Sequence, residues 1–415
     1  MINHSASRAL WTADWVCPGP GETIPGGAVV VEDGRVLAVG ESAALRQAWP
    51  EAPALHRGAA VLPLPANTHT HLDLTLCPAF HGSYEGFVRH MLACRDRRGA
   101  DGARAGLARL RWHRTGAVGD VVASPAAMEV LLAEAGLPGT VYWEVIAPDP
   151  GQAEARFRDL RAQVDAWRRR EGRLRVGLSP HAAHTVSAPL LRRIGEYARA
   201  EDIPLQIHAA ETPEEVIYFR EGKGPLRNLM REITGKPWKR PGMTPVAWLA
   251  ELGVLGPGTA VVHAVHAEAS DARLIAQAGA SVIACPRSNA ALGTGPFPWE
   301  RFREAGVPVA LGTDSTVTAG DLDVMGELRR LWGSVPPEDL LRAACCDGYR
   351  VLGLEPPSLA PGTPLGQVKV LEVPAPGADA APPTPGRKRA PGGRRGLKGA
   401  NVPEDPGAPG DSAGR

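Results

Sequence analysis

The sequence predicts an α/β protein built as a (β/α)8 TIM-like barrel, with a small accessory β-sheet made from the N- and C-terminal segments. The chain has 415 residues, which accommodates one barrel of about 250 residues and additional segments. Eight short apolar runs, most of them too brief for a helix and bounded by glycine or proline, alternate with helical patterns. Strand-like segments also occur before and after this alternating region. Short strands at both ends of a chain often meet in a small sheet, which predicts the accessory part.

Residues 1–60 are expected to form the N-terminal part of the accessory β domain. The segment GGAVVVEDGRVLAVG contains two valine-rich runs joined at Asp33-Gly34. An Asp-Gly pair between two apolar runs is a strong signal for a tight β-hairpin. Residues 351–373 are expected to complete this domain, because GQVKVLEVP alternates like one more strand.

Residues 61–350 are expected to form the barrel. Helical patterns such as AEARFRDLRAQVDAWRRR and APLLRRIGEYARAE lie between the strands. One connection, which includes EGKGPLRNLMREITGKPWKRPGMTP, is much longer than the others, and we expect it to cover a substrate. The eight predicted strands are AAVLPLPAN, GAVGDVVA, GTVYWEVIA, LRVGLSP, IPLQIHA, TAVVHAV, ASVIACP and VPVALGT.

Residues 374–415 are expected to be a disordered tail rich in proline, glycine and arginine. This stretch has no aromatic residue and very few large apolar ones. It therefore cannot bury enough surface to offset the entropy of ordering. Its RKR and RR clusters could touch polyanions, but a solvated tail explains them more simply.

Composition argues against several classes of partner. The chain has 46 Lys+Arg and 45 Asp+Glu, so its net charge of +1 provides no general attraction for nucleic acid or an anionic membrane. Its apolar runs are shorter than the ~18 residues that span a bilayer, and its start lacks the pattern of a secretory signal. The six cysteines form no C-x-x-C pair and fit buried thiols in a reducing cytoplasm. We expect a cytoplasmic protein with a small-molecule substrate, and a homodimer is compatible with the sequence.

The candidate chemistry lies where predicted barrel strands end. In Asn67-Thr68-His69-Thr70-His71 the two histidines at i and i+2 point to the same side of a strand. Further polar residues follow later strands, and active sites of such barrels lie at this rim. Neutral imidazoles with one carboxylate suit a divalent transition metal, with zinc or iron preferred over calcium or magnesium. The candidates are His69, His71, His208, Glu211, His263 and Asp314.

Three of these residues also have a structural explanation that the sequence leaves open. His263 and the nearby His266 could be satisfied histidines at a strand end, and Asp314 could cap a following helix. Glu211 could complement the dipole at the start of TPEEVIYF. Together these explanations require several coincidences at one rim, so a metal site is the favoured interpretation.

The chain resembles the amidohydrolase superfamily, in particular its branch of metal-dependent deaminases and chlorohydrolases. Members of that branch act on methylthioadenosine, S-adenosylhomocysteine, aminofutalosine, guanine and cytosine. The sequences of its motifs are most similar to those of the aminofutalosine-deaminase-like group. The segments that carry the resemblance, in the family's order from about residue 61 to about residue 330, are NTHTHLDL, GAVGD, SPHAAHTVS, IHAAET, VVHAVH, CPRSNAALGTG and LGTDS.

The resemblance implies roles for individual residues. Glu211 corresponds to the proton shuttle, and His263 to a histidine that contacts the attacking water or the developing oxyanion. His181 matches a substrate-binding position. No lysine occurs between His71 and His208, which favours a single metal ion, although Glu144 could bridge to a second one. The implied ligands of one divalent ion, zinc before iron, are His69, His71, His208 and Asp314.

The implied reaction is hydrolytic deamination of an aminopurine nucleoside such as aminofutalosine, methylthioadenosine or S-adenosylhomocysteine. A metal-activated water would attack the ring, with Asp314 taking its proton and Glu211 protonating a ring nitrogen. One alternative is hydrolysis of a C–Cl bond or a cyclic amide at the same site. Another is a non-catalytic metal- or purine-binding protein, which would need neither Glu211 nor His263.

Candidate substrate contacts follow the seventh predicted strand and flank the rim. Arg287 could bind a carboxylate such as the benzoate of aminofutalosine, or it could pair with a carboxylate of the protein. Asn289 faces the same rim and could bind a sugar or a base edge. His184 and Phe87 are candidate pocket walls, although such residues often serve only in packing.

Overall fold

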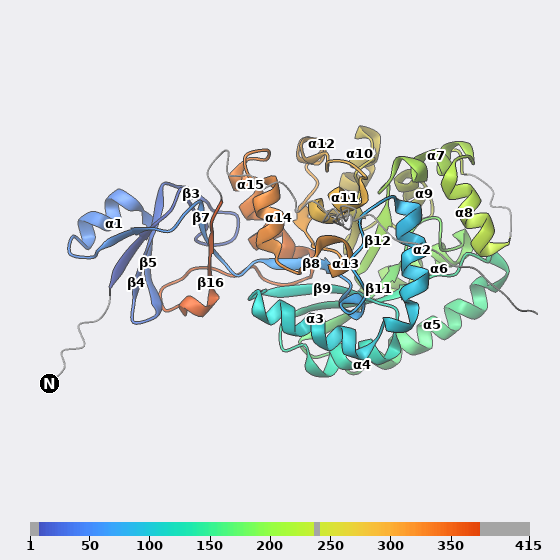
Figure 1. The fold of residues 1–415 in the computed structure, drawn as a ribbon, viewed down its shortest axis with the longest axis horizontal. Coiled ribbons are helices and arrows are strands. Elements are labelled where there is room, and N and C mark those ends of the chain that lie inside the picture. The colour runs from blue at the N-terminus through green and yellow to red at the C-terminus, as the bar shows by residue number, and fades with distance from the viewer. Residues whose placement is uncertain (1–7, 236–240, 374–415) are drawn as a thin grey trace, which may run out of the picture. The chain divides into compact units, whose positions relative to one another are not determined.

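The computed structural model describes residues 8–235 and 241–373 (Figure 1). The predicted tail, residues 374–415, lies outside the described residues. No helix in the described part of the chain is both long and apolar enough to cross a membrane. All six cysteines are buried and unpaired, as the sequence predicted.

The barrel is confirmed as eight parallel strands in the order in which they occur in the chain. The last strand meets the first through polar contacts: the Thr68 hydroxyl donates to the Leu311 carbonyl at 2.8 Å, and the Asp314 N–H donates to the His69 carbonyl at 2.9 Å. Strands buried on both faces read as apolar runs, which is why each was visible in the sequence. The strands are β8 (Ala66–Thr70), β9 (Ala117–Val122), β10 (Gly139–Val145), β11 (Leu174–Pro180), β12 (Leu205–Ala209), β13 (Thr259–His263), β14 (Ser281–Ala284) and β15 (Val309–Leu311).

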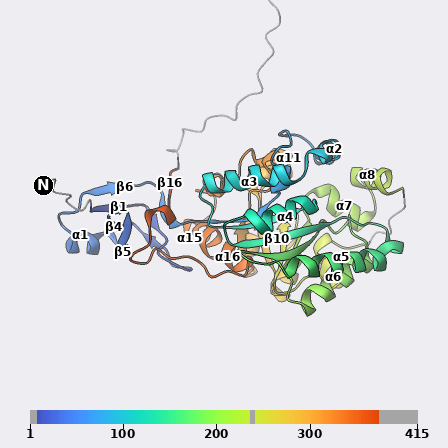
Figure 2. The same cartoon turned by 90° about the horizontal axis from the view of Figure 1, so that it is seen from below.

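Helices cover the outside of these strands (Figure 1 and Figure 2). The two predicted helical patterns are confirmed as α5 and α6, which lie side by side. In α5 the buried Phe157, Leu160, Val164 and Trp167 recur at helical spacing and form its core-facing stripe. The outer helices are α3 (Ala100–Trp112), α4 (Pro125–Glu134), α5 (Ala153–Arg168), α6 (Ala188–Ala200), α9 (Pro245–Glu251), α10 (Ala269–Gln277), α12 (Trp299–Glu304), α14 (Val324–Leu331), α15 (Pro337–Arg342) and α16 (Gly348–Val351).

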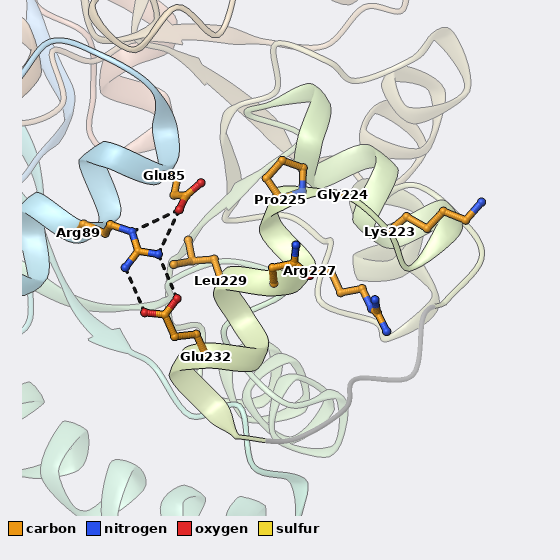
Figure 3. Close-up of a pocket in the computed structure, with 9 residues that line it drawn as sticks. Glu85, Arg89, Lys223, Gly224, Pro225, Arg227, Leu229 and Glu232 are labelled. Carbon is orange, nitrogen blue, oxygen red and sulfur yellow. Dashed lines mark hydrogen bonds and ion pairs between the residues drawn. The ribbon is translucent and has the colours of Figure 1, made fainter.

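Further helices follow the carboxyl ends of several strands. They are α2 (Tyr84–Cys94), α7 (Pro213–Glu221), α8 (Pro225–Thr234), α11 (Pro286–Leu292) and α13 (Thr316–Ala319). Arg89 of α2 donates to both carboxylate oxygens of Glu232 in α8, at 3.1 and 3.0 Å, and also contacts Glu85 (Figure 3). These residues line a surface pocket of about 510 Å³. The long connection predicted to cover a substrate contains α8, and its residues 236–240 lie outside the described residues.

The accessory β structure is confirmed, but it consists of two small sheets instead of one. The first has the order β5-β4-β1-β6, and the second has the order β16-β7-β2-β3. The predicted hairpin turns at Asp33 and Gly34, which adopt φ of 48° and 75°, as a type I′ turn requires. The elements are β1 (Ala9–Thr12), β2 (Trp15–Val16), β3 (Ile24–Pro25), β4 (Gly27–Glu32), β5 (Arg35–Glu41), α1 (Ser42–Ala48), β6 (Ala54–His56), β7 (Ala60–Pro63) and β16 (Val368–Leu371).

The run AAVLPLPAN, expected to be one barrel strand, is two strands in the structure. Its first part is β7, which pairs with β16 and β2 in the accessory sheet. Its last residues begin β8 of the barrel. Pro63 and Pro65 have no N–H to donate to a ladder, so one continuous barrel strand through them is unfavourable. As a result, β8 contains His69 itself and ends immediately before His71.

Candidate metal centre

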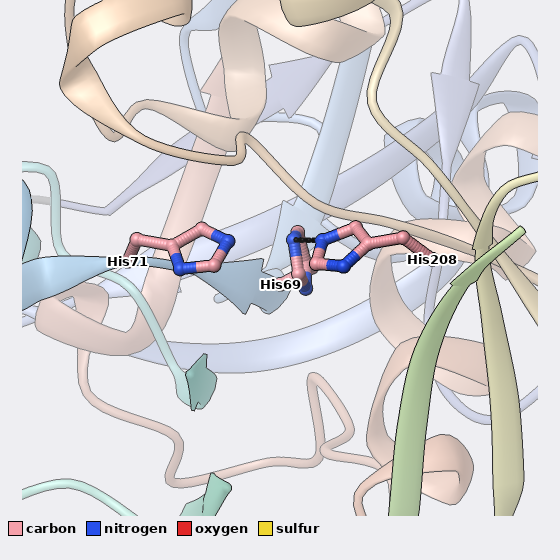
Figure 4. A group of neighbouring side chains, drawn as sticks. All are labelled: His69, His71 and His208. Carbon is pink, nitrogen blue, oxygen red and sulfur yellow. Dashed lines mark hydrogen bonds between the residues drawn. The ribbon is translucent and has the colours of Figure 1, made fainter. Parts of the chain in front are cut away.

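Three histidines from two strands converge at the carboxyl end of the barrel (Figure 4). His69 lies in β8, His71 is the first residue after this strand, and His208 lies in β12. One nitrogen of each ring lies within 4.8 Å of those of the other two. The His69 ring lies between the others, with centroids 4.9 Å from His71 and 5.0 Å from His208. All three side chains are buried, so their polar nitrogens need partners.

The hydrogen bonds of two of these rings determine which nitrogen carries the proton. The Gln206 amide nitrogen donates to the Thr68 carbonyl at 2.7 Å, so its oxygen accepts from Nδ1 of His69 at 2.8 Å. Nδ1 of His208 donates to the His181 carbonyl at 2.6 Å. Both Nε2 atoms therefore carry lone pairs, and they face each other across 3.2 Å. Two facing lone pairs repel unless a cation lies between them, so this donor set fits a metal ion.

Asp314 adds a carboxylate to this set. Its Oδ1 lies 3.6 Å from Nε2 of His71 and 3.9 Å from Nε2 of His69. The Ser288 hydroxyl donates to Oδ2 at 2.6 Å, and the Ser315 N–H donates to Oδ1 at 2.7 Å. Burial alone would raise the pKa of Asp314, but the facing imidazoles of His263 and His69 and the Ser288 hydrogen bond lower it overall. The helix cap proposed as an alternative falls on Ser315, the residue before α13.

The imidazoles at this end of the barrel are held in their neutral, metal-binding form. Burial lowers the pKa of His69 to about 3, with the neighbouring His208 acting in the same direction. Burial also lowers the pKa of His71, His181, His208 and His263. A neutral imidazole offers a lone pair to a divalent ion, whereas a protonated ring would repel it.

These shifts predict that the metal-stripped protein loses stability in mild acid. In the unfolded chain each histidine takes up a proton below its ordinary value of 6.5, while folded His69 resists protonation until about 3. The unfolded state therefore binds more protons in this window, and stability falls as the pH decreases through it. At about pH 5.5 His69 alone costs ~1.4 kcal/mol. Thermal unfolding of chelator-treated protein should show a clear decrease in Tm between about pH 7.5 and about pH 5.5, and an unchanged Tm would contradict the assigned burial.

Glu211 and His263 face each other beside the histidine cluster. Glu211 Oε1 lies 3.8 Å from Nε2 of His263, and Nδ1 of His263 donates to Asn289 Oδ1 at 2.9 Å. Burial raises the pKa of Glu211 to about 8, with His208 opposing the shift and Asp314 adding to it. His263, Ala210 and Asp314 adopt φ of 69°, 53° and 64°. Non-glycine residues in this region are strained, and such strain concentrates at functional sites.

The remaining histidine candidates lie beside this centre. The His181 ring is 5.1 Å from the His208 ring, and its Nδ1 contacts the Thr185 hydroxyl at 3.0 Å. His184 is buried beside Glu215 and also lines a cavity of about 720 Å³. His266, by contrast, is the satisfied histidine proposed as an alternative, because its Nε2 donates to the Thr294 carbonyl at 2.7 Å. The structure thus separates His263, at the centre, from His266, outside it.

Arg287 pairs with the protein, which was one of the two alternatives left open. Its guanidinium donates to Glu327 at 2.6 Å, to Asp321 at 2.7 Å and to the Asp323 carbonyl at 3.1 Å. Burial opposes its charge, but the two facing carboxylates raise its pKa overall, so it stays charged. Each of the three guanidinium nitrogens of Arg287 thus donates to a group of the protein, which favours a structural role, and its role as a substrate contact stays a prediction.

Replacing Arg287 with methionine should therefore reduce stability without raising KM. The variant leaves the fully buried Glu327 without its ion-pair partner, which typically costs about 3–5 kcal/mol. Denaturant unfolding should report this loss, and the double variant Arg287→Met/Glu327→Gln should recover part of it. A large increase in KM with unchanged stability would instead indicate that Arg287 contacts the substrate.

Three other sequence candidates are placed by their contacts. Asn289 reaches the centre through His263, as a hydrogen-bond partner of that ring. Phe87 packs in a separate apolar cluster with residues such as Phe80 and Val317. Glu144 accepts a hydrogen bond from Arg98 at 3.0 Å, and Arg98 also donates to Asp73 at 2.9 Å. Glu144 is thus in an ion pair, which supports a structural or substrate-side role over that of a bridge between two metals.

Three residues beside the centre, Gln206, Glu215 and Tyr84, were not among the candidates from the sequence. Gln206 precedes His208 by two positions, so the polar residue in an apolar strand was a usable signal for a partner of the site. Glu215 accepts a hydrogen bond from the Glu211 N–H at 2.9 Å. In the sequence, the pattern ETPEE indicated only the start of a helix. Tyr84 is close enough to Glu211, Glu215 and Asp314 for their charges to add to burial in raising its pKa. Its position in α2 gave no signal in the sequence.

Comparison with known proteins agrees with this arrangement. The model of the amidohydrolase family matches residues 61–364, and a model of the bacterial imidazolonepropionase-like composite domain matches residues 27–52. The aminodeoxyfutalosine deaminase of Deinococcus radiodurans is 40% identical over 371 residues, which cover 85% of this chain and 88% of that protein.

Two solved structures are similar in fold. The aminofutalosine deaminase of Helicobacter pylori in complex with methylthio-coformycin has a TM-score of 0.69 at 20% identity, covering 86% of this chain and 90% of that one. An adenosine deaminase from Xanthomonas campestris with bound zinc has a TM-score of 0.62 at 26% identity, covering 86% of this chain and 83% of that one. The similarity therefore extends over the barrel and the accessory β structure.

Proposed function

The chain belongs to the amidohydrolase family, and we propose that it deaminates an aminopurine nucleoside, whose amino group is released as ammonia. It is a hydrolase acting on carbon–nitrogen bonds other than peptide bonds. Among the candidate substrates we place aminodeoxyfutalosine first, because the Deinococcus radiodurans relative is named for that compound. Methylthioadenosine and S-adenosylhomocysteine are the other candidates.

The observation that carries this proposal is the pair of unprotonated Nε2 atoms of His69 and His208, 3.2 Å apart and buried. His69, His71, His208 and Asp314 would hold one divalent ion there, and we propose zinc, which the Xanthomonas campestris structure contains. Such an ion supplies a Lewis acid and makes a bound water acidic enough to attack at neutral pH. A site built only to bind a purine would have no use for this donor set.

The residues around the centre divide the proton transfers between them. Burial raises the pKa of Glu211 to about 8, which favours the protonated form that can donate to a ring nitrogen and make the adjacent carbon electrophilic. The ionised Asp314, held by Ser288 and Ser315, can accept a proton from the attacking water. His263, oriented by Asn289, bounds the space opposite Glu211 in which water and the reacting carbon meet. The proton that Asp314 accepts then passes to the amino group, which leaves as ammonia, and Glu211 regains a proton from the hydroxyl group that has added to the ring.

An ammonia-release assay on the zinc-loaded protein tests this proposal. Aminodeoxyfutalosine, methylthioadenosine and S-adenosylhomocysteine should be compared at equal concentration, with a chlorinated analogue included to detect chloride release. We expect ammonia from the aminopurine nucleosides, with the highest kcat/KM for aminodeoxyfutalosine. Chloride release without ammonia would favour a chlorohydrolase, and tight binding without turnover would favour a binding protein.

Location and assembly are also part of the proposal. Six buried, unpaired cysteines are consistent with a reducing compartment, and we propose the cytoplasm. The homodimer and the lack of a nucleic-acid partner stay predictions from the sequence, as do the domain boundaries.

A further inference from the structure

Glu211 lies in the three-residue link between β12 and α7, residues 210–212, and the backbone of this link has an unusual conformation. Ala210 adopts φ of 53°, a conformation that non-glycine residues rarely adopt without support. Thr212 caps α7, with its side chain accepting the Glu215 N–H at 3.1 Å. In the usual capping box the carboxylate at this position would accept the N–H of the capping residue. Here Glu215 Oε2 instead accepts the N–H of Glu211, at 2.9 Å.

The Glu215 carboxylate lowers the stability of the fold at this position. Its side chain is only 4% exposed, and Oε1 has no hydrogen-bond partner among the described residues. Nδ1 of His184, likewise without a hydrogen-bond partner in the described part of the chain, lies 3.7 Å away. A buried carboxylate that is only partly compensated costs stability. A helix cap alone does not account for it, because Thr212 already provides that cap.

The charge of Glu215 reaches the Glu211 carboxyl. Burial raises the pKa of Glu211, and Asp314 and Glu215 raise it further, whereas His208 and His184 oppose them. Removing the negative charge of Glu215 would therefore leave Glu211 easier to ionise. The titratable groups that face Glu211 from the surrounding elements are Tyr84 of α2, His184 after β11, His208 of β12, Glu215 of α7, His263 of β13 and Asp314 after β15.

We propose that Glu215 is a positioning residue for Glu211: it holds the Glu211 backbone through the N–H and keeps the carboxyl in its proton-carrying form, with His184 as its electrostatic partner. This role rests on the proposed deaminase function. Glu215 does not touch the reacting atoms and acts through Glu211. This positioning role is useful only in an enzyme in which the Glu211 carboxyl must be both oriented toward the substrate and protonated.

Two substitutions separate the positional effect from the electrostatic one. Glu215→Gln keeps an oxygen that can accept the Glu211 N–H but removes the charge, whereas Glu215→Ala removes both. Glu214→Gln, in the same first turn of α7, is the matched control, because it removes one negative charge without contacting the Glu211 N–H. Melting temperatures of the zinc-loaded variants identify any that fail to fold.

The kinetic result should distinguish the three variants. Glu211 must carry a proton to donate it, so activity falls as the pH rises through the Glu211 pKa. This fall is the alkaline limb of the pH–activity profile. In Glu215→Gln its midpoint should move to lower pH by about one unit, with KM unchanged. In Glu215→Ala kcat should fall by at least about tenfold at every pH, because the acid is also misplaced. Alkaline limbs and kcat values equal to those of Glu214→Gln would overturn the proposal.

A second measurement does not depend on turnover. Infrared titration of the zinc-loaded protein, as the difference between the parent and Glu211→Gln, reports the Glu211 carboxyl directly. We expect this carboxyl to ionise at lower pH in the Glu215→Gln background than in the parent. An identical titration in both backgrounds contradicts the inference even if the parent releases ammonia. Absence of ammonia from the parent, with a shifted titration, contradicts only the proposed function.

Discussion

Replacing Glu211 with glutamine should abolish most turnover while the protein keeps its metal. Glutamine has the same shape but carries no transferable proton, so the ring nitrogen loses its acid. General acid–base catalysis of this kind contributes about 10²–10⁴-fold, and we expect kcat to fall by that factor. Glu211 does not belong to the proposed ligand set, so zinc content measured by elemental analysis should stay near one ion per chain.

The matched control is Glu221→Gln, at the C-terminal end of α7, the helix that follows Glu211. Glu221 is exposed and pairs loosely with Lys223 at 3.7 Å, so its replacement should leave kcat and Tm essentially unchanged. Full activity in Glu211→Gln would remove the proton shuttle from the mechanism. Loss of zinc together with activity would mean instead that Glu211 belongs to the metal site.

Loss of one candidate ligand should have an even larger effect. His208→Ala removes one of the two facing lone pairs, and we expect no measurable zinc after dialysis and no measurable ammonia release. Gln206→Ala leaves all ligands in place but frees Nδ1 of His69. Loss of such an outer partner typically costs about 10–100-fold in metal affinity, so this variant should regain activity when excess zinc is added.

Two comparisons make the metal result specific. His56→Asn changes an exposed histidine of the accessory sheet and should bind zinc like the parent. Chelation of the parent should abolish activity, and added zinc should restore it. If His208→Ala retained one tightly bound ion, the convergence of His69, His71 and His208 would not be the metal site, and the mechanism would need a different centre.

Most of the barrel could be predicted because its strands are buried on both faces. Such strands appear in the sequence as short apolar runs between glycines and prolines, and β9 to β15 all coincide with predicted runs. The first run was the exception. AAVLPLPAN is as apolar as the others, and its division between β7 and β8 depends on which partners each half finds. Pro63 and Pro65 marked the division, but the pattern of apolar residues did not.

The candidate site was predictable in its residue types and not in its hydrogen bonds. His69, His71, His208, Glu211, His263 and Asp314 follow or end strands, and the closure of the barrel brings such positions to one rim. Arg287 and Asn289 follow the same strand and looked equivalent in the sequence. In the structure one pairs with Glu327 and the other with His263. That difference depends on α14 and β13, which are distant in sequence from both residues.

By itself, the sequence determined the kind of chemistry, because imidazoles and carboxylates at strand ends are read directly from residue type and strand period. The tertiary structure alone decided which atoms are free to react. His69 and His208 present unprotonated Nε2 atoms because Gln206 and the His181 carbonyl occupy the opposite nitrogens. Burial and the nearby carboxylates raise the pKa of Glu211, which favours its protonated form. A proton's position depends on every group within a few ångströms, and folding assembles those groups from segments far apart in the chain.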